Sequence, residues 1–519
     1  MPAEIRAWGE ACLPGDNKYR VIGDNVLDLV RDEDFAALYE RTGRQALSPG
    51  LLALVTIFQF MENLPDREAV AQLVVRLDWK YALHLGLDYA GFDFTGLCHF
   101  RQRLLEHGAE RLVFDQLLAK IRALGFLKKR GKQRTDSIAV LGAVAQLSVL
   151  ETARETLRLV VRALREADAV WSARAVPASF QEEYGQRRPE YRLSAAERAA
   201  ALLQAGADGY WLLDLLETDA AAGLARLAAV VTLRQVWAQR FVREAGVVTV
   251  HEAAVPCTER ILTPHDVGVR AGEKRGKHWQ GEKAHVTETA EPDQPNFIVD
   301  VHTGNASGGD AAALDPIREQ LAVADLLPGE QYVDSGYISG RQLAQSQAAG
   351  IELVGPPLAD TSPQEYKIAD FAIDQEARQA TCPQGRVSVK WGESSERDGS
   401  RMVHIQFATA TCAACPVRSL CARGKEGRSL HVSEHHALLQ ARRAEAQTAT
   451  FKERMRARPA IEATLSELVR KHGFRRHRYR GEAKRRLENL LKCAACNLKR
   501  LARALAARPA EAQVLVGRA

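Results

Sequence analysis

The sequence predicts an α/β protein: a mixed sheet with flanking helices, combined with an N-terminal all-α domain, a helical insertion and a Cys-rich insertion. Strands and helices alternate over residues 277–356, helical periodicity dominates residues 1–125 and 151–245, and four cysteines cluster between residues 382 and 421. Strand–helix–strand alternation is typical of a sheet with parallel strands. At 519 residues, the chain is long enough for two to four domains.

Composition indicates a globular protein with a substantial core, because 46% of the residues are hydrophobic and 26% are charged. No run of about 18 uncharged apolar residues is present, so we expect no membrane contact. The start, MPAEIRAWGEACLPGD, lacks the basic and apolar regions of a secretory signal. We therefore expect a cytoplasmic protein, associated with the nucleoid if it binds DNA, whose nine cysteines are thiols or metal ligands rather than disulfides.

Positive charge is concentrated at the C-terminus. From Phe451 onward the chain has 19 Lys and Arg against 6 Asp and Glu, a net charge of +13. The whole chain carries +6, so the preceding 450 residues carry −7. A basic module on a slightly acidic body favours a polyanion partner such as nucleic acid over a merely solvated helix surface.

The N-terminal 125 residues predict short helices. Ser48-Pro49 is an N-cap followed by a proline at the first helical position, and it opens LLALVTIFQFMEN. Thr95 is expected to cap GLCHFRQRLLEHG, which puts Arg101 and Arg103 near a helix start. This pattern is compatible with a DNA-binding helix-turn-helix module and equally with a plain helical bundle.

A strand is predicted from Gln133 to about Leu147, with Asp136 at its leading end. Five positively charged residues, between Lys128 and Arg134, precede Asp136. Further on, KHWQGEKAHVTET and NFIVDVHTG predict an antiparallel pair, and EQYVDSGYISG predicts a strand that ends at Asp334. Open α/β sheets bind ligands at the carboxyl ends of their strands, so Asp334 is a candidate site residue.

Two helices are predicted near the C-terminus, in RPAIEATLSELVRKHG and LENLLKCAACNLKRLARAL. Ile461, Leu465, Leu468 and Val469 form the apolar stripe of the first, and Gly473 is the expected C′ residue. Glu462 lies off this stripe, with Arg458 four residues earlier on the same face. Asp136, Asp334 and Glu462 are hard oxygen ligands that could share Mg²⁺ or Mn²⁺, although each acid alone is more often a cap, turn or solvated residue.

The four clustered cysteines read C-x29-C-x2-C-x5-C, and they are Cys382, Cys412, Cys415 and Cys421. A CxxC pair in a loop-rich segment with two further cysteines favours a structural zinc site over four reduced thiols. The strand hairpin VSVKWGESSERDGSRMVHIQF would fill the long first gap. Cys493 and Cys496 also form CxxC, but they lie in a helical run and are predicted to be small core residues.

Several blocks resemble bacterial insertion-sequence DDE transposases. RTDSIAVLGAV, YVDSGY and RPAIEATLSELVRKHGFRRHRYRG, followed by AK and NLKRL, look like the three catalytic blocks of that group. WQGEKAHVTET resembles its strand block, and LSPGLLALVTIFQF and CHFRQRL resemble its N-terminal helical domain. The resemblance covers nearly the whole chain in order. It implies an RNase H-like catalytic domain in which Asp136, Asp334 and Glu462 are the catalytic, metal-binding acids.

The family also has a Tyr/Arg/Glu/Lys signature on the last catalytic helix. Arg458 and Glu462 match its arginine and glutamate, whereas Met455 stands at the tyrosine position and Val469 at the lysine position. In the first block, Ile138-Ala139 replaces the family's frequent Thr-His. These departures weaken the inference about handling of DNA ends more than the inference about the metal site.

The resemblance implies a transposase that cleaves the ends of its element and joins them to target DNA by phosphoryl transfer with two Mg²⁺ or Mn²⁺ ions. It implies double-stranded DNA, both terminal repeats and target, as partner, and a homodimer in the synaptic complex. Two alternatives remain: a catalytically inactive DNA-binding regulator, and a metal-dependent nuclease unrelated to transposition. The expected DNA-contacting residues are Arg101, Arg103, Arg458, Arg475, Arg476, Arg478, Tyr479, Arg480 and Lys484.

These observations together predict six segments. They are an N-terminal helix-turn-helix-like domain (1–125), the first part of the catalytic domain (126–150), a helical insertion (151–245), the continued catalytic domain (246–364), a Cys-rich insertion (365–440), and the catalytic helix with a basic helical tail (441–519).

Overall fold

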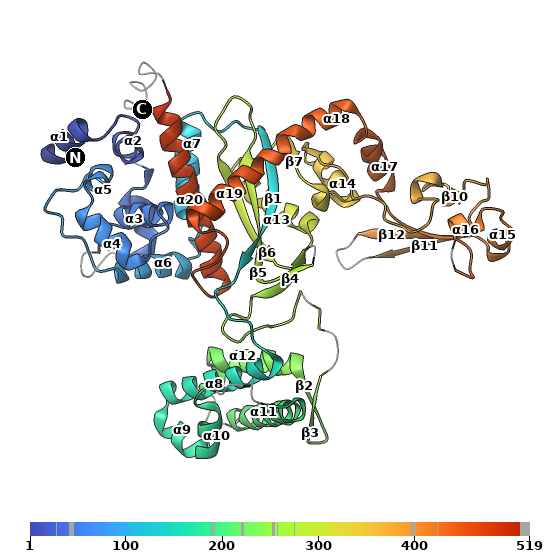
Figure 1. Ribbon diagram of the computed structural model, residues 1–519, viewed down its shortest axis with the longest axis horizontal. Helices are drawn as coiled ribbons and strands as arrows, with labels where there is room; N and C mark the ends of the chain where they lie inside the picture. Colours follow the sequence, from blue (N-terminus) through green and yellow to red (C-terminus); the bar gives the residue numbers. More distant parts are fainter. Residues whose placement is uncertain are drawn as a thin grey trace.

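The computed structural model is built around one mixed sheet, with helices packed on it and two bodies projecting from it (Figure 1). None of the helices in the described part of the chain is long and apolar enough to cross a bilayer. The structure describes residues 1–26, 29–40, 46–187, 190, 193–218, 223–251, 255–256, 258–274, 276–395, 400–422 and 424–508.

The N-terminal region is helical, as predicted. Ser48 is the N-cap of α3, because its hydroxyl accepts a hydrogen bond from Leu51 N, and Pro49 is the first helical residue. Thr95 begins α6 instead of capping it, and Asp93 accepts a hydrogen bond from Thr95 N. The elements are α1 (Ala3–Cys12), α2 (Lys18–Asn25), η2 (Asp32–Leu38), α3 (Pro49–Met61), α4 (Asp66–Val75), α5 (Leu77–Ala82), α6 (Thr95–Glu106) and α7 (Leu112–Ala123).

The sheet runs in the order β4-β5-β1-β7-β8, and β6 also pairs with β5. The β1–β5, β5–β6 and β4–β5 pairs are antiparallel, whereas β1–β7 and β7–β8 are parallel. The antiparallel pair predicted before Asp334 is therefore confirmed as β5 and β6. The strands are β1 (Lys132–Leu141), β4 (Arg270–Lys274), β5 (Lys277–Thr289), β6 (Ile298–Asn305), β7 (Glu330–Tyr332) and β8 (Glu352–Val354).

Asp136 lies in the middle of β1, not at its leading end as the sequence suggested. The strand begins at Lys132, one residue before the predicted start, and ends at Leu141 instead of about Leu147. Lys132, Gln133 and Arg134 pair with β7 in parallel register. Asp334 follows the carboxyl end of β7 by two residues, as expected. The adjacent strands β1 and β7 therefore bring the two aspartates to the same part of the sheet.

One face of the sheet shares its core with the N-terminal helices and the C-terminal helix. Val140, Ala284 and Val286 from the sheet belong to the same apolar cluster as Leu491 and Leu498 of α20. In Figure 1, α20 lies beside α7, between the N-terminal helices and the sheet. Other helices of this part are α13 (Asp310–Val323), η5 (Ser335–Tyr337), α14 (Gly340–Ala348), α17 (His436–Glu445), α18 (Ala449–Arg454), η7 (Met455–Ala460), α19 (Ile461–His472) and α20 (Glu482–Ala506).

The helical insertion forms a body of its own below the sheet in Figure 1, with a separate core that includes Leu157, Leu212 and Trp237. It ends in a short hairpin, β2–β3, that the helical pattern did not predict. Its elements are α8 (Val149–Ala167), α9 (Ala169–Ala175), α10 (Ala178–Tyr184), α11 (Ala195–Leu216), η4 (Leu224–Arg226), α12 (Ala228–Arg240), β2 (Phe241–Glu244) and β3 (Val247–Val250).

The second projecting body, residues 366–433, carries the four clustered cysteines and is called the cysteine lobe below. The predicted hairpin is present as β11–β12, and β13 joins it in a three-stranded sheet over a small core. The elements are η6 (Ile368–Asp370), β9 (Ala372–Asp374), β10 (Gln379–Thr381), β11 (Lys390–Ser395), β12 (Arg401–Gln406), α15 (Thr409–Ala413), α16 (Arg418–Cys421) and β13 (Ser429–Ser433).

Candidate active site

Asp136 is a buried carboxylate on the central strand of the sheet, with 7% of its surface exposed. Its Oδ1 accepts a hydrogen bond of 2.8 Å from Ser137 N. Burial raises the pKa of Asp136 above its ordinary value; Arg458 opposes this shift, and the negative charge of Asp334 adds to it. The two aspartates are therefore electrostatically coupled.

Asp334 begins a single helical turn after β7. Its Oδ1 accepts a hydrogen bond of 2.9 Å from Gly336 N, which fixes the direction of the side chain. A Cβ atom at Gly336 would lie only 2.8 Å from Asp310 Oδ2 and 3.2 Å from Asp334 Oδ1. The turn therefore uses glycine because carboxylates crowd this position.

Glu462 is the second residue of α19, and 67% of its side chain is exposed. Helix N-termini favour negative charge. The packed face of α19 holds the helix in place through Ile461, Leu465 and Leu468, all buried, and Gly473 ends it in the left-handed conformation, as predicted. Glu462 is thus presented to solvent from a fixed helix.

Arg458 joins the three acids. Its Nη2 lies 2.7 Å from Asp136 Oδ2 and 3.6 Å from Asp334 Oδ2. Its Nη1 lies 3.3 Å from Glu462 Oε1, which is the predicted contact one helical turn away. Only 16% of the Arg458 side chain is exposed. The three acids predicted from the sequence therefore surround one guanidinium, and we call these four residues the acid cluster.

The acid cluster fits a divalent cation by its donor set. Three carboxylates around one guanidinium leave a net negative charge, and carboxylate oxygens are the ligands that Mg²⁺ and Mn²⁺ prefer. The ligand oxygens of Asp136, Asp334 and Glu462 do not all lie within 4.8 Å of one another. Side-chain movement is therefore needed for all three to contact a common ion.

The basic run after α19 is joined to the sheet through its backbone. Leu141 N donates to Arg475 O at 2.9 Å, and His477 N donates to Leu141 O at 2.9 Å. Arg475, Arg476, Arg480 and Lys484 are exposed. Three exposed arginines of the run therefore lie beside the end of β1, the strand that carries Asp136.

His477 anchors the basic run to the interior of the protein through buried ion pairs, which the sequence pattern did not reveal. Its ring is fully buried, with Nε2 3.0 Å from Glu282 Oε2 and Nδ1 3.4 Å from Glu488 Oε2. These carboxylates raise the pKa of His477 against the opposing effect of burial. Glu488 also accepts a hydrogen bond from Arg478 N, so a buried ion pair sets the backbone of the basic run.

Arg101, Arg478 and Tyr479 are used inside the protein. Arg101 is 6% exposed and pairs with Asp66 Oδ2 at 2.5 Å, so it is not positioned to contact DNA as expected. Arg478 Nη1 donates to Leu64 O at 2.6 Å. Tyr479 is half-buried, with the Arg101 guanidinium 5.4 Å from its ring centre. These contacts connect the basic run to the N-terminal helices.

The remaining predicted contacts lie at different places. Arg103 is half-buried over the ring of Tyr39, at 4.1 Å. Met455 packs on a small apolar cluster that includes Tyr332 and Val354. Val469 is half-buried, and the adjacent Arg470 and Lys471 are exposed. The family's tyrosine position is thus filled by a packing residue here.

The four cysteines of the lobe line one cavity of about 30 Å³. Arg386 N donates to Cys382 Sγ and Arg428 N donates to Cys412 Sγ, both at 3.4 Å. Burial raises the pKa of Cys421, and the Arg428 charge opposes this shift. No three of the four sulfurs lie within 4.8 Å of one another. The structure brings the four thiols to one place, in a more open arrangement than a closed tetrahedral site.

Comparison with known families gives two matches. Residues 381–502 match the model described as a transposase DDE domain, and residues 9–103 match a transposase domain (DUF772). The first range contains the four cysteines, Arg458 and Glu462, but neither aspartate. No curated protein and no solved structure matches the chain. These two segments of the chain are therefore similar to transposase domains, which supports the general resemblance and leaves the insertion-sequence group open.

Proposed function

We propose that the chain is a DNA transposase that cleaves the ends of an insertion sequence and joins them to target DNA. The observation that carries this proposal is the convergence of Asp136, Asp334 and Glu462 on Arg458. The two matches to transposase domains support the same conclusion.

The sheet supports an RNase H-like catalytic domain. Strands β6, β5 and β1 are joined antiparallel, and β1, β7 and β8 follow in parallel. This order supports the RNase H-like arrangement that the sequence resemblance implies. It sets the first aspartate on the central strand and the second just beyond the neighbouring strand.

Asp136, Asp334 and Glu462 would hold two Mg²⁺ or Mn²⁺ ions. Such ions supply Lewis acidity to the phosphate and lower the pKa of bound water or hydroxyl. The overall reaction is attack of water on a phosphodiester at the element's end, with departure of the 3′ oxygen. The freed 3′-hydroxyl then attacks a target phosphodiester in the same way. The helix of Glu462 and the turn of Asp334 keep their carboxylates on one side of the sheet for both steps.

Arg458 would change partners when DNA binds. In the free protein its guanidinium offsets the mutual repulsion of the three carboxylates. Facing DNA, the same planar fork suits a phosphate. The exposed Arg475, Arg476 and Arg480, beside the end of β1, would contact further phosphates.

The cysteine lobe would bind one structural Zn²⁺ through Cys382, Cys412, Cys415 and Cys421. Their common cavity and the two N–H···S hydrogen bonds support this proposal. Closing the four sulfurs onto one ion requires them to move inward, since no three are yet within 4.8 Å.

A cleavage and joining assay tests the proposed function. The substrate is DNA that flanks the gene, supplied with Mg²⁺ and a supercoiled target, and cut and joined products are measured separately. Wild type should give both, and Asp136→Asn should give neither while still binding the DNA. Glu453→Gln, an exposed acid five residues before Arg458 and outside the acid cluster, is the matched control.

Three outcomes would overturn the proposal. Cleavage without joining would indicate a nuclease. Binding without cleavage by the wild type would indicate a regulator. Cleavage retained by Asp136→Asn would show that the acid cluster is not the active site.

A further inference from the structure

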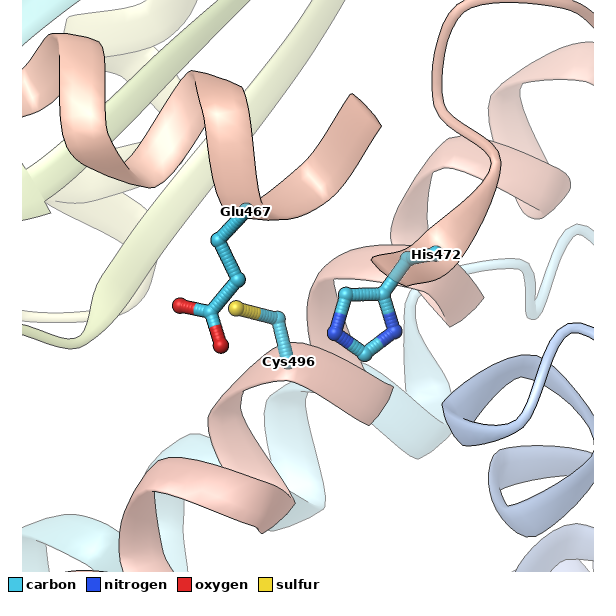
Figure 2. Close-up of side chains that lie close together, drawn as sticks. All are labelled: Glu467, His472 and Cys496. Carbon is cyan, nitrogen blue, oxygen red and sulfur yellow. The ribbon is translucent and has the colours of Figure 1, made fainter. Parts of the chain in front are cut away.

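A second group of ligand-type side chains lies away from the acid cluster, between α19 and α20. Glu467 and His472 extend from α19 and Cys496 from α20 (Figure 2). One ligand atom from each, a carboxylate oxygen, a ring nitrogen and the sulfur, lie within 4.8 Å of one another. Among the described residues, this is the one set of three His, Cys, Asp or Glu side chains that meets this distance.

His472 gives the independent sign of a ligand. The residue is fully buried, and its Nδ1 lies 3.1 Å from Phe60 O, so Nδ1–H donates and Nε2 carries the free lone pair. Nε2 is buried and has no hydrogen-bond partner among the residues that the structure describes. In Figure 2, one ring nitrogen of His472 lies on the side that faces Cys496 and Glu467. A buried polar atom without a partner costs about 1–3 kcal/mol, so this nitrogen needs an explanation.

Cys496 and Glu467 complete the set. Cys496 is fully buried, and burial raises the pKa of its thiol to about 12. Glu467 Oε2 accepts hydrogen bonds of 3.0 and 3.2 Å from Arg500, and Oε1 forms longer ion pairs, of 3.8 Å to Lys499 and 3.9 Å to Arg503. Without an ion, the thiol can donate to Glu467, but this leaves His472 Nε2 unpaired.

We propose that Glu467, His472 and Cys496 bind one zinc ion. Sulfur, imidazole nitrogen and carboxylate oxygen are the three ligand types of protein zinc sites, and three protein ligands leave one position for water. The His472 Nδ1–H bond to a backbone carbonyl is the usual support of a metal-bound histidine. Arg500 would hold the carboxylate from the other side.

The distances need only a small contraction. Ligand atoms of a tetrahedral zinc are about 3.3–3.8 Å apart for bonds of about 2.0–2.3 Å. The three atoms here already lie within 4.8 Å of one another, so they must move only somewhat closer to bind one ion. The thiol must lose its proton on binding, which weakens the net affinity.

The position of this site gives it a consequence for the acid cluster. Glu467 lies on the same helix as Glu462, and His472 contacts α3 through Phe60. A bound ion would therefore fasten the helix of Glu462 to α20 and to the N-terminal helices. This inference does not depend on the proposed function, because the site is defined by its own three residues.

Zinc content per chain tests the proposal. Purified wild type, Cys496→Ser, His472→Gln and Cys493→Ser are dialysed against zinc-containing and then zinc-free buffer, and bound zinc is counted by mass spectrometry. Cys493 is the matched control, since it is fully buried on the same helix and outside the group. Cys496→Ser and His472→Gln should each hold one ion fewer than wild type, and Cys493→Ser should hold the same number. Equal zinc in all four proteins would overturn the proposal.

A second measurement uses the unsubstituted chain and so does not depend on whether variants fold. Crystals of wild type grown with zinc are measured on both sides of the zinc absorption edge. An anomalous peak within bonding distance of Cys496 Sγ and His472 Nε2 is expected. A map with no peak between α19 and α20 would overturn the proposal, whatever the cysteine lobe contains.

Discussion

The acid cluster and the cysteine lobe both gather potential metal ligands, but they are built in different ways. The acid cluster draws on three distant segments, β1, the turn after β7, and the η7–α19 junction. The cysteine lobe takes all four thiols from one segment, residues 382–421, with a small core of its own. The acid cluster is assembled by the pairing of distant strands in the sheet, whereas the thiols of the cysteine lobe come from one continuous segment.

The two sites also differ in charge. Carboxylates are ionised at neutral pH, so the acid cluster needs Arg458 as a counter-charge when no metal is bound. Thiols are neutral at that pH, and burial raises the pKa of Cys421 further, so the lobe needs no cation. If both proposals hold, the acid cluster keeps its shape without metal through Arg458, whereas the lobe would need metal to close its four thiols.

The largest expected effect is loss of structure in the lobe. Replacing Cys382, Cys412, Cys415 and Cys421 together by serine should remove one zinc and make residues 366–433 sensitive to protease. Structural zinc binding contributes about 10–16 kcal/mol in zinc-finger peptides, which far exceeds what a small core supplies. Limited proteolysis with peptide mapping measures this. The exposed Cys12 and Cys98, replaced by serine, serve as controls. An unchanged digestion pattern would remove zinc from the account of the lobe.

The next effect concerns DNA binding beside the acid cluster. Each phosphate contact contributes about 0.9 to the slope of log K against log salt. Replacing Arg475, Arg476 and Arg480 by alanine should therefore make the slope shallower by about 2.7. The matched control is the lobe triple Arg378, Arg386 and Arg401, which are also exposed. If the slope changed in the lobe variant and not in the basic-run variant, the DNA would bind at the lobe and not beside the acid cluster.

A smaller effect is expected from Arg458→Gln. A unit charge at 4 Å is worth about 4 kcal/mol at an effective dielectric constant of 20, and solvent reduces this further. Removing it should raise the Mn²⁺ affinity of the DNA-free protein by at least about tenfold, while DNA cleavage falls. Calorimetric Mn²⁺ titration measures the affinity. The neighbouring Arg456→Gln is the control, because Arg456 is 77% exposed and pairs with Glu453 instead. Unchanged affinity in Arg458→Gln would mean that Arg458 is no counter-charge.

The smallest effect is on stability. The raised pKa of Asp136 means that its ionised form is disfavoured in the folded protein. Metal-free wild type should therefore gain stability as pH falls through this raised pKa toward the unfolded value, and lose it as pH rises. Asp136→Asn lacks this dependence and should melt about 1–3 °C higher at pH 7. Melting curves of both proteins between pH 4 and 8 check the sign. A lower melting temperature for the variant at pH 7 would show that the Arg458 pair outweighs the burial of Asp136.

The three acids were predicted from weak local signs together with the resemblance to a transposase family. Asp334 ends a predicted strand, Asp136 stands at the leading end of another, and Glu462 lies off the apolar stripe of a helix with Arg458 one turn before. The common contact to Arg458 could not be predicted, because it requires the sheet to bring β1 and β7 together. The same pairing with β7 involves Lys132, Gln133 and Arg134, which precede Asp136 in β1.

The basic run was predicted only in part, because charge alone does not reveal tertiary partners. Arg475, Arg476 and Arg480 are exposed as expected, whereas Arg478 binds Leu64 O. Arg101 lies on the packed side of α6 and meets Asp66. The expected DNA role of the exposed residues stays a prediction.

Cys496 shows a similar limit. Its burial was predicted from its helical run, and the structure confirms it. Its contact with His472 and Glu467 joins two helices whose packing no sequence period encodes. From the sequence alone, a cysteine in an apolar helix is interpreted as a core residue, because its neighbours in the fold are not known.

The most direct test of the central claim is Mn²⁺ affinity across single amide variants of the acid cluster. Mn²⁺ binding is measured by electron paramagnetic resonance for wild type, Asp136→Asn, Asp334→Asn and Glu462→Gln, with Glu453→Gln as control. Losing one carboxylate ligand should weaken binding by about tenfold or more in each of the three, since charged ligands contribute more than about 1.4 kcal/mol. The control should bind like wild type. Wild-type affinity in all three acid variants would contradict the account of a single metal-binding active site around Arg458.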